Sequence, residues 1–437
     1  MSRTLTFDLG TSYFKVCLFD ETLRLAARHS LPVPITAQEA GRCELAVRDF
    51  DHCLDVAVRE LSRDCGGLGN VTKVCFASQA NTFTLLGNGG TPLMPFLVWS
   101  DQRACEDDTF AREFAAGINF YRETGIAQLD HQFMVAKLHW LQQHSPALVN
   151  ETRRVCTLSD YFVWRLTGNF LTEAGLAGLT GLVNIHQLRY RADALERSHL
   201  TSAQLPPIVR AGSDVGRVRP PIVADWGLSP DCRLVMGCLD QYAGAIGAGI
   251  TSAGGVCETT GTVLATVRCA RGFSEQTNAG VFQGPAFTPG LYFQMVFSSL
   301  SAGVLERYRN RLPDRPSFDE LDRLAAEVPT GAEGLQFNRA AILDDSIEMF
   351  LARTARHRHG HEVRAILEAV ARELKEQVAT LCGDDLPAVV KSCGGAARSR
   401  LWLDIKREIV GCDFEPINCP EPTSLGAARL TNELHMT

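Results

Sequence analysis

The sequence lacks the local patterns by which metal-binding and nucleotide-binding proteins are most often found. No C-x-x-C pair occurs among the 15 cysteines, which argues against a zinc or redox site of that kind. Neither G-x-x-x-x-G-K-[ST] nor G-x-G-x-x-G joins a strand to a helix, which excludes the common phosphate-binding loops. We therefore expect reduced, mostly buried thiols, and any phosphate site must be built from another kind of turn.

The chain also lacks an excess of charge of one sign and a long apolar run. Its 43 Lys and Arg against 50 Asp and Glu give a net charge of −7, which offers no electrostatic case for binding DNA or RNA. The opening residues MSRTLTFDLG do not have the basic, apolar and small-residue order of a secretory signal. The longest uncharged stretch, residues 276–305, is broken by Pro285 and Pro289. We expect a cytoplasmic protein with no nucleic-acid or membrane partner.

An internal repeat is present. Residues 4–8 and 14–19 alternate as strands do, and the turn Gly10-Thr11-Ser12 lies between them. The same strand, turn and strand recur over residues 255–267, where Gly261 aligns with Gly10 at an offset of 251 residues. This pattern predicts duplicated α/β domains.

The length of 437 residues by itself allows two large domains or three ordinary ones, and 45% hydrophobic residues are enough for a sizeable core. The repeat favours two domains that face each other across a central cleft, over residues 1–245 and 246–437.

Apolar spacing predicts further elements. The expected strands lie at residues 74–77, 84–86, 233–237 and 388–391, and the expected helices at 133–144, 159–166, 362–381 and 399–410. Paired prolines at 206–207 and 220–221 predict a loop-rich stretch before the third of these strands.

Asp8 and Lys15 flank the first turn. Asp8 ends an apolar strand directly before Gly-Thr-Ser, whose N–H groups and hydroxyls can hold phosphate oxygens while the carboxylate holds Mg²⁺ or its waters. A single D-x-G-T is more often an Asx turn that closes a hairpin, but its recurrence at Gly261 favours the phosphate interpretation. Lys15 can reach the same phosphates, or it can be an ordinary exposed strand lysine.

Asp240 and the glycines near residue 394 each follow a strand. Asp240 begins a small-residue helix, where it can be a plain N-cap. Its carboxylate can also accept the proton of a substrate hydroxyl as that oxygen attacks a phosphoryl group, and the two roles are compatible. Gly394-Gly395-Ala396 would let a planar nucleotide lie against the backbone; taken alone, a helix-entry turn is the more frequent case.

Three further segments carry polar groups. Ser78-Gln79-Ala80-Asn81 and Trp99-Ser100-Asp101-Gln102-Arg103 can surround a sugar or be ordinary loop polarity. The run from His357 to His361 suggests a metal site. Because no Cys or carboxylate cluster lies nearby, a solvated linker before the long helix is the favoured interpretation.

Taken together, these segments resemble the FGGY carbohydrate kinase family, with its actin-like (ribonuclease H-like) pair of domains. The matches, in the family's order from residue 5 to residue 430, are FDLGTSYFKV, FLVWSDQRA, LSDYFVWRLTG, GCLDQYAGAIGAG, ETTGT, KSCGGAARSRLW and PEPTSLGAARL. Two features depart from the family pattern. Where xylulose kinases carry Gln-Met-His, this chain has Gln79-Ala80-Asn81, and the stretch 271–360 is short and lacks a recognisable glycine-arginine-proline motif.

The resemblance implies an ATP- and Mg²⁺-dependent kinase that phosphorylates a hydroxyl of a ketose or polyol, with the sugar on the first domain and ATP mainly on the second. It implies that Asp240 is the catalytic base and that Asp8 and Asp240 hold the metal ion. The residues implied to bind phosphate or ATP are Gly10, Thr11, Ser12, Lys15, Gly261, Thr262, Gly394, Gly395 and Ala396. Those implied to surround the sugar are Gln79, Asn81, Trp99, Asp101, Arg103, Asp240 and Gln241. A homodimer is compatible with this interpretation.

Two other functions compete with a kinase. A non-catalytic sensor of sugar or nucleotide can use the same fold, although intact Asp8 and Asp240 count against it. An actin-like or chaperone-like ATPase predicts ATP turnover without sugar and no role for Gln79 or Trp99.

Overall fold

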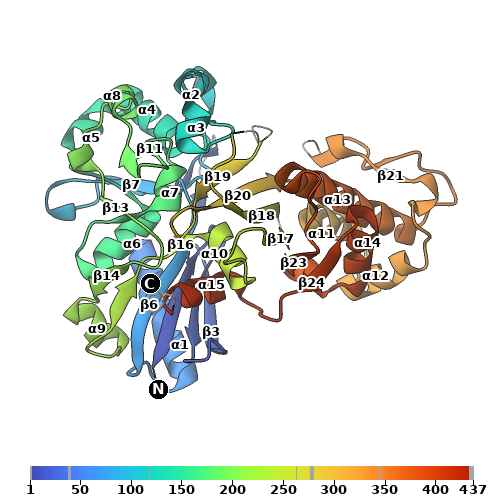
Figure 1. Cartoon of the computed structure of the whole chain (residues 1–437), viewed down its shortest axis with the longest axis horizontal. Helices are drawn as coiled ribbons and strands as arrows, with labels where there is room; N and C mark the ends of the chain where they lie inside the picture. The colour runs from blue at the N-terminus through green and yellow to red at the C-terminus, as the bar shows by residue number, and fades with distance from the viewer. Residues whose placement is uncertain are drawn as a thin grey trace. The chain divides into compact units, whose positions relative to one another are not determined.

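The computed structural model describes residues 2–37, 41–117, 119–261, 263–275, 280–342, 344 and 346–432. The chain forms two compact units, and each combines helices with sheets (Figure 1). The first unit consists of residues 1–247, 271–293 and 421–437, and the second of residues 248–270 and 294–420. The sequence suggests a single boundary near residue 245, whereas the first unit also takes up two segments that come later in the chain.

The main sheet of the first unit has seven strands in the order β14-β15-β6-β1-β2-β3, with β16 paired to β6. Their bounds are β1 (Arg3–Leu9), β2 (Tyr13–Phe19), β3 (Leu25–Pro32), β6 (Val71–Ser78), β14 (Asp214–Arg217), β15 (Arg233–Val235) and β16 (Cys238–Leu239). Strands β1 and β2 form the predicted antiparallel hairpin. Strands β1, β6 and β16 run parallel, so their carboxyl ends meet at one edge of the sheet.

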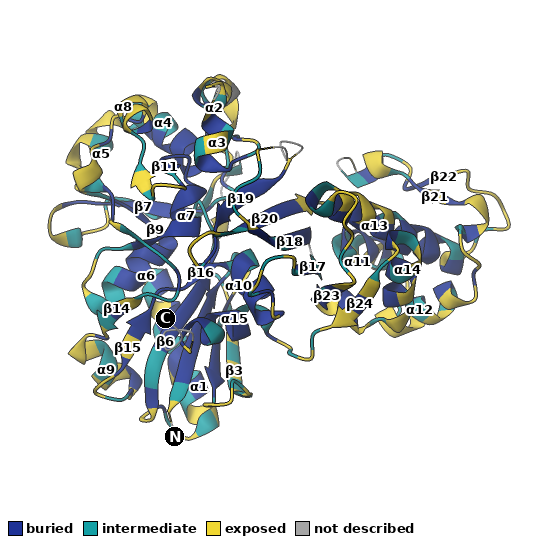
Figure 2. Ribbon diagram, in the orientation of Figure 1, coloured by how far each residue is buried: buried dark blue, intermediate teal, exposed yellow. Residues whose placement is uncertain are grey.

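Helices cover both faces of this sheet, which explains why β1, β2 and β6 are mostly buried (Figure 2). On one face, Phe50 of α1 (Val47–Cys65) packs edge-on against Phe14, with ring centroids 5.4 Å apart. On the other face, α15 (Pro422–Leu430) packs against β1 and β2, with Ser424 beside Cys17. Phe14 and Cys17 are an odd number of residues apart on β2, as opposite faces of a strand require.

A second sheet of the first unit has the order β4-β5-β8-β7-β9. Its strands are β4 (Thr36–Ala37), β5 (Cys43–Leu45), β7 (Phe83–Leu86), β8 (Phe96–Leu97) and β9 (Arg154–Thr157). The helices of this unit that follow α1 are α2 (Asp108–Ala115), α3 (Phe120–Thr124), α4 (Met134–His144), α5 (Pro146–Glu151), α6 (Leu158–Thr167), α7 (Ala174–Gly178), α8 (Ala192–Arg197), α9 (Pro220–Trp226) and α10 (Asp240–Gly247). Helices α4 and α6 confirm the helices predicted at 133–144 and 159–166.

The second unit repeats the strand arrangement of the first. Strand β17 (Val256–Thr260) pairs antiparallel with β18 (Leu264–Arg271) and parallel with β23 (Val389–Cys393), which in turn pairs parallel with β24 (Asp413–Pro416). The hairpin predicted over 255–267 is therefore confirmed. Its helices include α11 (Ala302–Arg311), α12 (Phe318–Ala326), α13 (His359–Cys382) and α14 (Arg400–Val410).

Helix α13 begins earlier than the sequence predicts. Its apolar face is buried as expected, with Val363, Val370 and Val378 all inaccessible to solvent. The solvated linker expected over 357–361 is wrong for its last residues, because His359, Gly360 and His361 form the first helical turn. Glycine at position 360 lets this first turn of α13 lie close to α12, since a Cβ there would be 2.5 Å from the carbonyl oxygen of Leu324 in α12.

Two other expectations can be compared with the structure. The loop predicted around Pro220-Pro221 is wrong in part, because these prolines begin α9. Proline is tolerated there because the N–H groups of the first helical turn have no acceptor within the helix, so its missing N–H costs no helical hydrogen bond. Most of the cysteines are buried, as expected. Among the residues that the structure describes, no helix combines the length and apolarity needed to cross a membrane.

Candidate active site

Asp8 and Asp240 lie in the first unit at the carboxyl ends of β1 and β16, the two strands that flank the end of β6. Asp8 is the next-to-last residue of β1, and Asp240 directly follows β16. Burial raises the pKa of Asp8 to about 6, against the opposing charge of Lys15. Burial, together with the negative charge of Asp8, raises the pKa of Asp240 to about 7. The charge of Asp8 therefore acts on the ionisation of Asp240, and near neutral pH Asp240 can take up a proton.

Glycines fix the backbone that carries Asp240. A Cβ on Gly237 would lie 1.8 Å from the carbonyl oxygen of Phe76, so only glycine lets this strand end approach β6. Helix α10, which Asp240 begins, packs directly on α15: a Cβ on Gly426 would lie 1.8 Å from the carbonyl oxygen of Ala243. The small residues of GAIGAG and SLGAA are thus needed for this backbone contact.

Lys15 lies between two carboxylates rather than in open solvent. Its Nζ is 3.0 Å from Oε2 of Glu421 and 3.7 Å from Oδ2 of Asp8. Burial opposes the charge of Lys15, but the two carboxylates outweigh it and raise the pKa of Lys15. Glu421, the residue before α15, also accepts a bond of 2.7 Å from Arg28. Glu421 was not singled out from the sequence, although it lies in the quoted segment PEPTSLGAARL.

Gln79 braces the first turn. Its Nε2 donates to the carbonyl oxygens of Gly10 (3.0 Å) and Leu9 (3.4 Å). Its Oε1 accepts from the hydroxyls of Thr82 (2.8 Å) and Thr11 (3.3 Å). Both donors and both acceptor positions of this carboxamide are therefore used inside the protein. Within the same turn, the side chain of Ser12 is exposed.

Trp99 reaches the same turn from the loop after β8. Its indole N–H donates to the hydroxyl of Thr11 at 2.7 Å, and its backbone N–H donates to Thr82 Oγ1 at 3.0 Å. Thr11, Gln79, Thr82 and Trp99 thus form one hydrogen-bonded group. Trp99 is half-buried, so part of its surface remains accessible.

Asp101 and Asn81 are used for internal contacts. Asp101 is fully buried and accepts from Nε (2.7 Å) and Nη2 (3.0 Å) of Arg103 and from the N–H of Cys43 (2.7 Å). Although burial opposes it, these bonds hold the pKa of Asp101 below its usual value. Asn81 has a positive φ of 58°, and its Oδ1 accepts from the N–H of Met134 at the start of α4.

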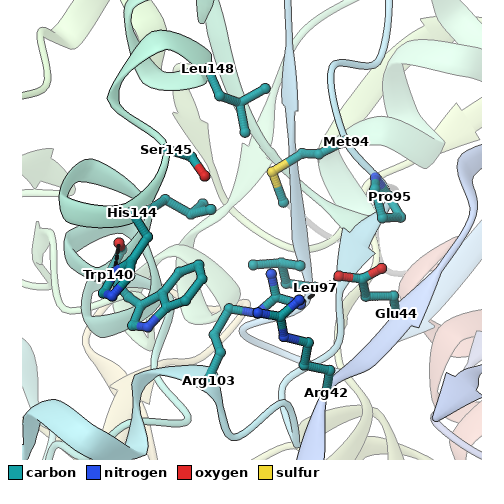
Figure 3. A pocket seen from close by; sticks show the side chains of 11 residues that line it. Arg42, Glu44, Met94, Pro95, Leu97, Arg103, Trp140, His144, Ser145 and Leu148 are labelled. Atoms are coloured by element: carbon teal, nitrogen blue, oxygen red, sulfur yellow. Dashed lines mark hydrogen bonds and ion pairs between the residues drawn. The ribbon is translucent and has the colours of Figure 1, made fainter. Parts of the chain in front are cut away.

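Arg103 lines a pocket of about 380 Å³ that lies apart from Asp8 and Asp240. In Figure 3 its guanidinium group lies beside that of Arg42, with Trp140 to one side and the carboxylate of Glu44 to the other. The lining residues are Arg42, Glu44, Met94, Pro95, Leu97, Arg103, Trp140, Leu141, His144, Ser145 and Leu148. None of Asp8, Gln79, Trp99 or Asp240 lines it. The structure therefore separates Arg103 from the group of residues at the strand ends.

Lys137 is a buried cation that sequence reasoning missed. It lies on α4, is inaccessible to solvent, and donates from Nζ to the carbonyl oxygens of Trp99 and Gln132 at 2.8 Å and of Val98 at 3.0 Å. Burial lowers the pKa of Lys137 to about 7. In the sequence its only signal is a lysine at an apolar position of the helix.

The second unit carries the other predicted turn. Ser301 and the N–H of Gly303 both donate to the carbonyl oxygen of Gly261, at 2.7 and 3.2 Å. Gly394 has a φ of +86°, and a Cβ there would lie 2.9 Å from the carbonyl oxygen of Thr260. The two predicted glycine turns of this unit are thus brought together. Thr262, also predicted to bind phosphate, lies outside the described residues.

A pocket of about 470 Å³ opens beside these turns, entirely within the second unit. Its lining consists of Thr260, Gly261, Ala302, Gly303, Leu305, Glu306, Phe318, Asp319, Asp322, Gly395, Ala396, Arg398, Ser399 and Trp402. Helices α11 and α12 therefore form a wall that the glycine motifs alone did not reveal. Burial raises the pKa of Asp322.

A buried ion pair lies directly beneath the second turn. Nζ of Lys406 is 2.6 Å from Oε1 of Glu258, and neither side chain is accessible to solvent. Lys406 also donates to Thr260 Oγ1 at 3.0 Å, and Ser392 hydrogen-bonds Glu258. These contacts hold the carboxyl end of β17 in place, and Gly261 directly follows that end.

The comparison with protein families agrees with this geometry. The model described as the FGGY family of carbohydrate kinases, N-terminal domain, matches residues 3–247, and the C-terminal domain model matches residues 236–432. The chain belongs to the FGGY family of carbohydrate kinases. It is therefore a phosphotransferase that phosphorylates an alcohol group of a sugar, and the competing sensor and ATPase interpretations are disfavoured.

Relatives and solved structures of this family cover nearly the whole chain. The chain is 26% identical to xylulose kinase of Bacillus subtilis (strain 168), over 98% of this chain and 88% of that protein. It is 22% identical to gluconokinase of the same organism, over 98% and 87%. A ligand-bound xylulose kinase from Lactobacillus acidophilus has the same fold, with a TM-score of 0.90, 20% identity and coverage of 100% and 90%. The two-domain α/β fold expected from the sequence is thus confirmed.

Proposed function

We propose that this FGGY kinase transfers the γ-phosphoryl group of ATP to a hydroxyl group of a ketose or related polyol, with Asp240 as the general base. The observation that carries the proposal is the environment of Asp240. Burial and the charge of Asp8 raise its pKa to about 7, which is where a base that works at neutral pH is most effective.

Proton transfer and phosphoryl transfer are coupled in this proposal. The sugar hydroxyl gives its proton to a carboxylate oxygen of Asp240 as the hydroxyl oxygen attacks the γ-phosphorus, and ADP leaves. The N–H of Gln241 donates to Oδ1 of Asp240 at 2.7 Å and so orients the carboxylate. Because little covalent chemistry falls to the protein, most of the rate enhancement comes from positioning and charge.

The donor set around Asp8 fits Mg²⁺. Within the described part of the chain, no three His, Cys, Asp or Glu side chains are grouped so as to hold a metal by themselves. Mg²⁺ bound to a nucleotide needs only one or two carboxylates, because phosphate oxygens and waters complete its shell. Asp8 and Asp240 would supply them, and when bound the ion neutralises charge on the transferred phosphoryl group.

The phosphates are proposed to bind at the turns that follow β1 and β17, and the nucleoside beside the turn at Gly394. Gly10, Thr11 and Ser12 would hold the γ-phosphate with Lys15 as a positive charge beside it, and Gly261 with Thr262 would hold the neighbouring phosphates. The adenosine would occupy the 470 Å³ pocket beside Gly395 and Ala396, a size suited to a small cofactor. Gly394 lets this turn approach Thr260.

The sugar is proposed to contact Asp240, Gln241 and the accessible part of Trp99. Gln79 and Asp101 would then act by shaping this wall, because their polar atoms are taken by the internal bonds described above. Asn81 would do so through its Oδ1, which accepts from the N–H of Met134. The names of the relatives make ketopentoses and gluconate the first compounds to test.

The experiment is a coupled assay of ADP release with the wild type and the D240N variant. The panel would contain ketopentoses, deoxyhexuloses, gluconate, glycerol and other polyols. Loss of the base should lower kcat by about 10² to 10⁴-fold and leave sugar binding largely unchanged. Near-normal turnover of D240N would contradict the assignment of the base. Absence of turnover of the wild type with every sugar would contradict the proposed substrate class.

A further inference from the structure

Lys137 has an unusual set of partners for a buried cation. Its side chain is 0% exposed, and the described residues place no carboxylate within ion-pair distance of it. Three backbone carbonyl oxygens, those of Gln132, Val98 and Trp99, accept its short hydrogen bonds, and the carbonyl oxygen of Asn81 is a fourth, longer contact. Burying a lysine costs free energy that packing alone does not offset. The hydrogen bonds to these carbonyl oxygens therefore compensate for the burial of Lys137.

The geometry matches the ammonium form. An ammonium group has three N–H donors, and the three short contacts of 2.8, 2.8 and 3.0 Å use all of them. A neutral amine would leave one carbonyl oxygen facing a lone pair. Burial opposes the ammonium form and lowers the pKa of Lys137 to about 7, whereas the charges of Asp101 and Asp130 favour that form and the charge of Arg103 opposes it.

The chain segments that meet at Lys137 are those next to the proposed sugar site. Val98 and Trp99 belong to the loop after β8, and Gln132 precedes α4. The carbonyl oxygen of Asn81, in the loop after β6, lies 3.5 Å from Nζ. The side chain of Asn81 also accepts from Met134 on the same helix, at 3.0 Å. One helix end thus holds both loops.

The loop after β8 is hydrogen-bonded to the turn between β1 and β2, which is proposed to hold phosphate, because the indole N–H of Trp99 donates to Thr11. We propose that Lys137 is a positioning residue for sugar binding, whose ammonium group holds the loop over residues 98–103 so that Trp99 reaches Thr11 and presents its face to the sugar. The kinetic part of this inference rests on the proposed function, whereas its structural part does not.

Lys73 provides a matched control within the same unit. It also donates from Nζ to a backbone carbonyl, that of Thr431, at 2.6 Å, but it lies near the amino end of β6, away from the carboxyl strand ends that carry the proposed site. K137M and K73M each remove one lysine and its carbonyl contacts. Hydrogen exchange of the peptides covering residues 96–103 would be measured by mass spectrometry in both variants and the wild type.

We expect faster exchange over 96–103 in K137M and not in K73M. With the sugar from the panel that the wild type turns over fastest, K137M should raise the sugar KM by about 10-fold or more, as loss of charged hydrogen bonds implies. The KM for ATP should change by less than about 2-fold, and K73M should alter neither KM. A folded K137M with exchange over 96–103 and sugar KM equal to the wild type would overturn the proposal.

A second variant covers the case in which K137M does not fold. K137A leaves room for an added ethylammonium ion, which would restore slow exchange over 96–103 and lower the sugar KM if the positive charge is what matters. No effect of the amine on exchange would overturn the proposal. If the wild type phosphorylates no sugar at all, the proposed function fails, while the exchange measurements still decide the role of Lys137.

Discussion

The indole N–H of Trp99 donates a hydrogen bond of 2.7 Å to the hydroxyl oxygen of Thr11. Thr11 lies in the turn between β1 and β2, and Trp99 follows β8, a strand of the five-stranded sheet of the same unit. Thr82 makes a second connection, because its hydroxyl accepts from the backbone N–H of Trp99 and donates to Gln79. The turn proposed to hold phosphate and the wall proposed to face the sugar are therefore one hydrogen-bonded structure.

W99F tests this connection. Phenylalanine keeps an aromatic face but cannot donate to Thr11, so kcat/KM should fall by about 2 to 12-fold, the range that one ordinary hydrogen bond supplies. T11V removes the other partner with little change of shape. If the bond matters, the double variant should lose less than the product of the two single losses. Effects that simply multiply would show that Trp99 and Thr11 act independently.

The positions of the two carboxyl groups at the strand ends could be predicted because local pattern identifies them. Asp8 and Asp240 each end an apolar run and precede small residues, and a carboxylate after a buried strand is placed by the strand itself. The roles of Gln79 and Asp101 could not be predicted in this way. Their polar atoms are taken by Gly10 and Cys43, and such pairings depend on tertiary contacts across dozens of residues.

Buried charges were missed for the same reason. Glu421 is separated from its partner Lys15 by 406 residues, and in the sequence it is only one more acidic residue beside a proline. The fold was easier to predict, since the hairpins and the apolar face of α13 follow from periods of 2 and 3.6 residues. Helix α1 was not singled out, and the start of α13 depends on the approach of Leu324 to Gly360.

Activity should depend on pH through Asp240. Its raised pKa of about 7 means that the carboxyl group is protonated below neutral pH and then accepts no proton from the sugar. We therefore expect kcat/KM for the sugar to rise with pH and to level off above about 7. Measuring kcat/KM between pH 5 and 9 tests this. A rate that is constant down to pH 5 would mean that the charge of Asp8 and burial do not govern the base.

D240N should make the ligand-free protein more stable at pH 8. A carboxyl group whose folded pKa lies above its unfolded pKa holds its proton more tightly in the folded state. Its contribution to stability is therefore present at low pH and is lost as pH rises towards about 7. Asparagine does not ionise, so D240N does not lose stability in this way as pH rises. The Tm of D240N should therefore exceed that of the wild type by a few degrees at pH 8 and by less at pH 5. Equal differences at both values would contradict the linkage.

K406M should destabilise the second unit. It would leave the buried carboxylate of Glu258 without its cation, and breaking such a pair costs about 3–5 kcal/mol. Urea unfolding measures this cost. The E258Q/K406M variant removes both charges and should recover part of the loss, which separates the cost of an unpaired charge from the loss of packing. A double variant no more stable than K406M would indicate that packing dominates.

G394A should weaken nucleotide binding more than it weakens folding. Gly394 has a φ of +86°, and an added Cβ would lie 2.9 Å from the carbonyl oxygen of Thr260, whose neighbour Gly261 lines the pocket. Gly411, at the end of α14, is a matched control, because its φ is +89° but nothing lies within 4 Å of the added Cβ. Both substitutions put alanine in the left-handed region, at a cost of about 1–2 kcal/mol each. Only G394A should raise the KM for ATP, since only there must the turn move away from Thr260. If G411A raises that KM equally, strain in the second unit as a whole, and not the contact with Thr260, is responsible.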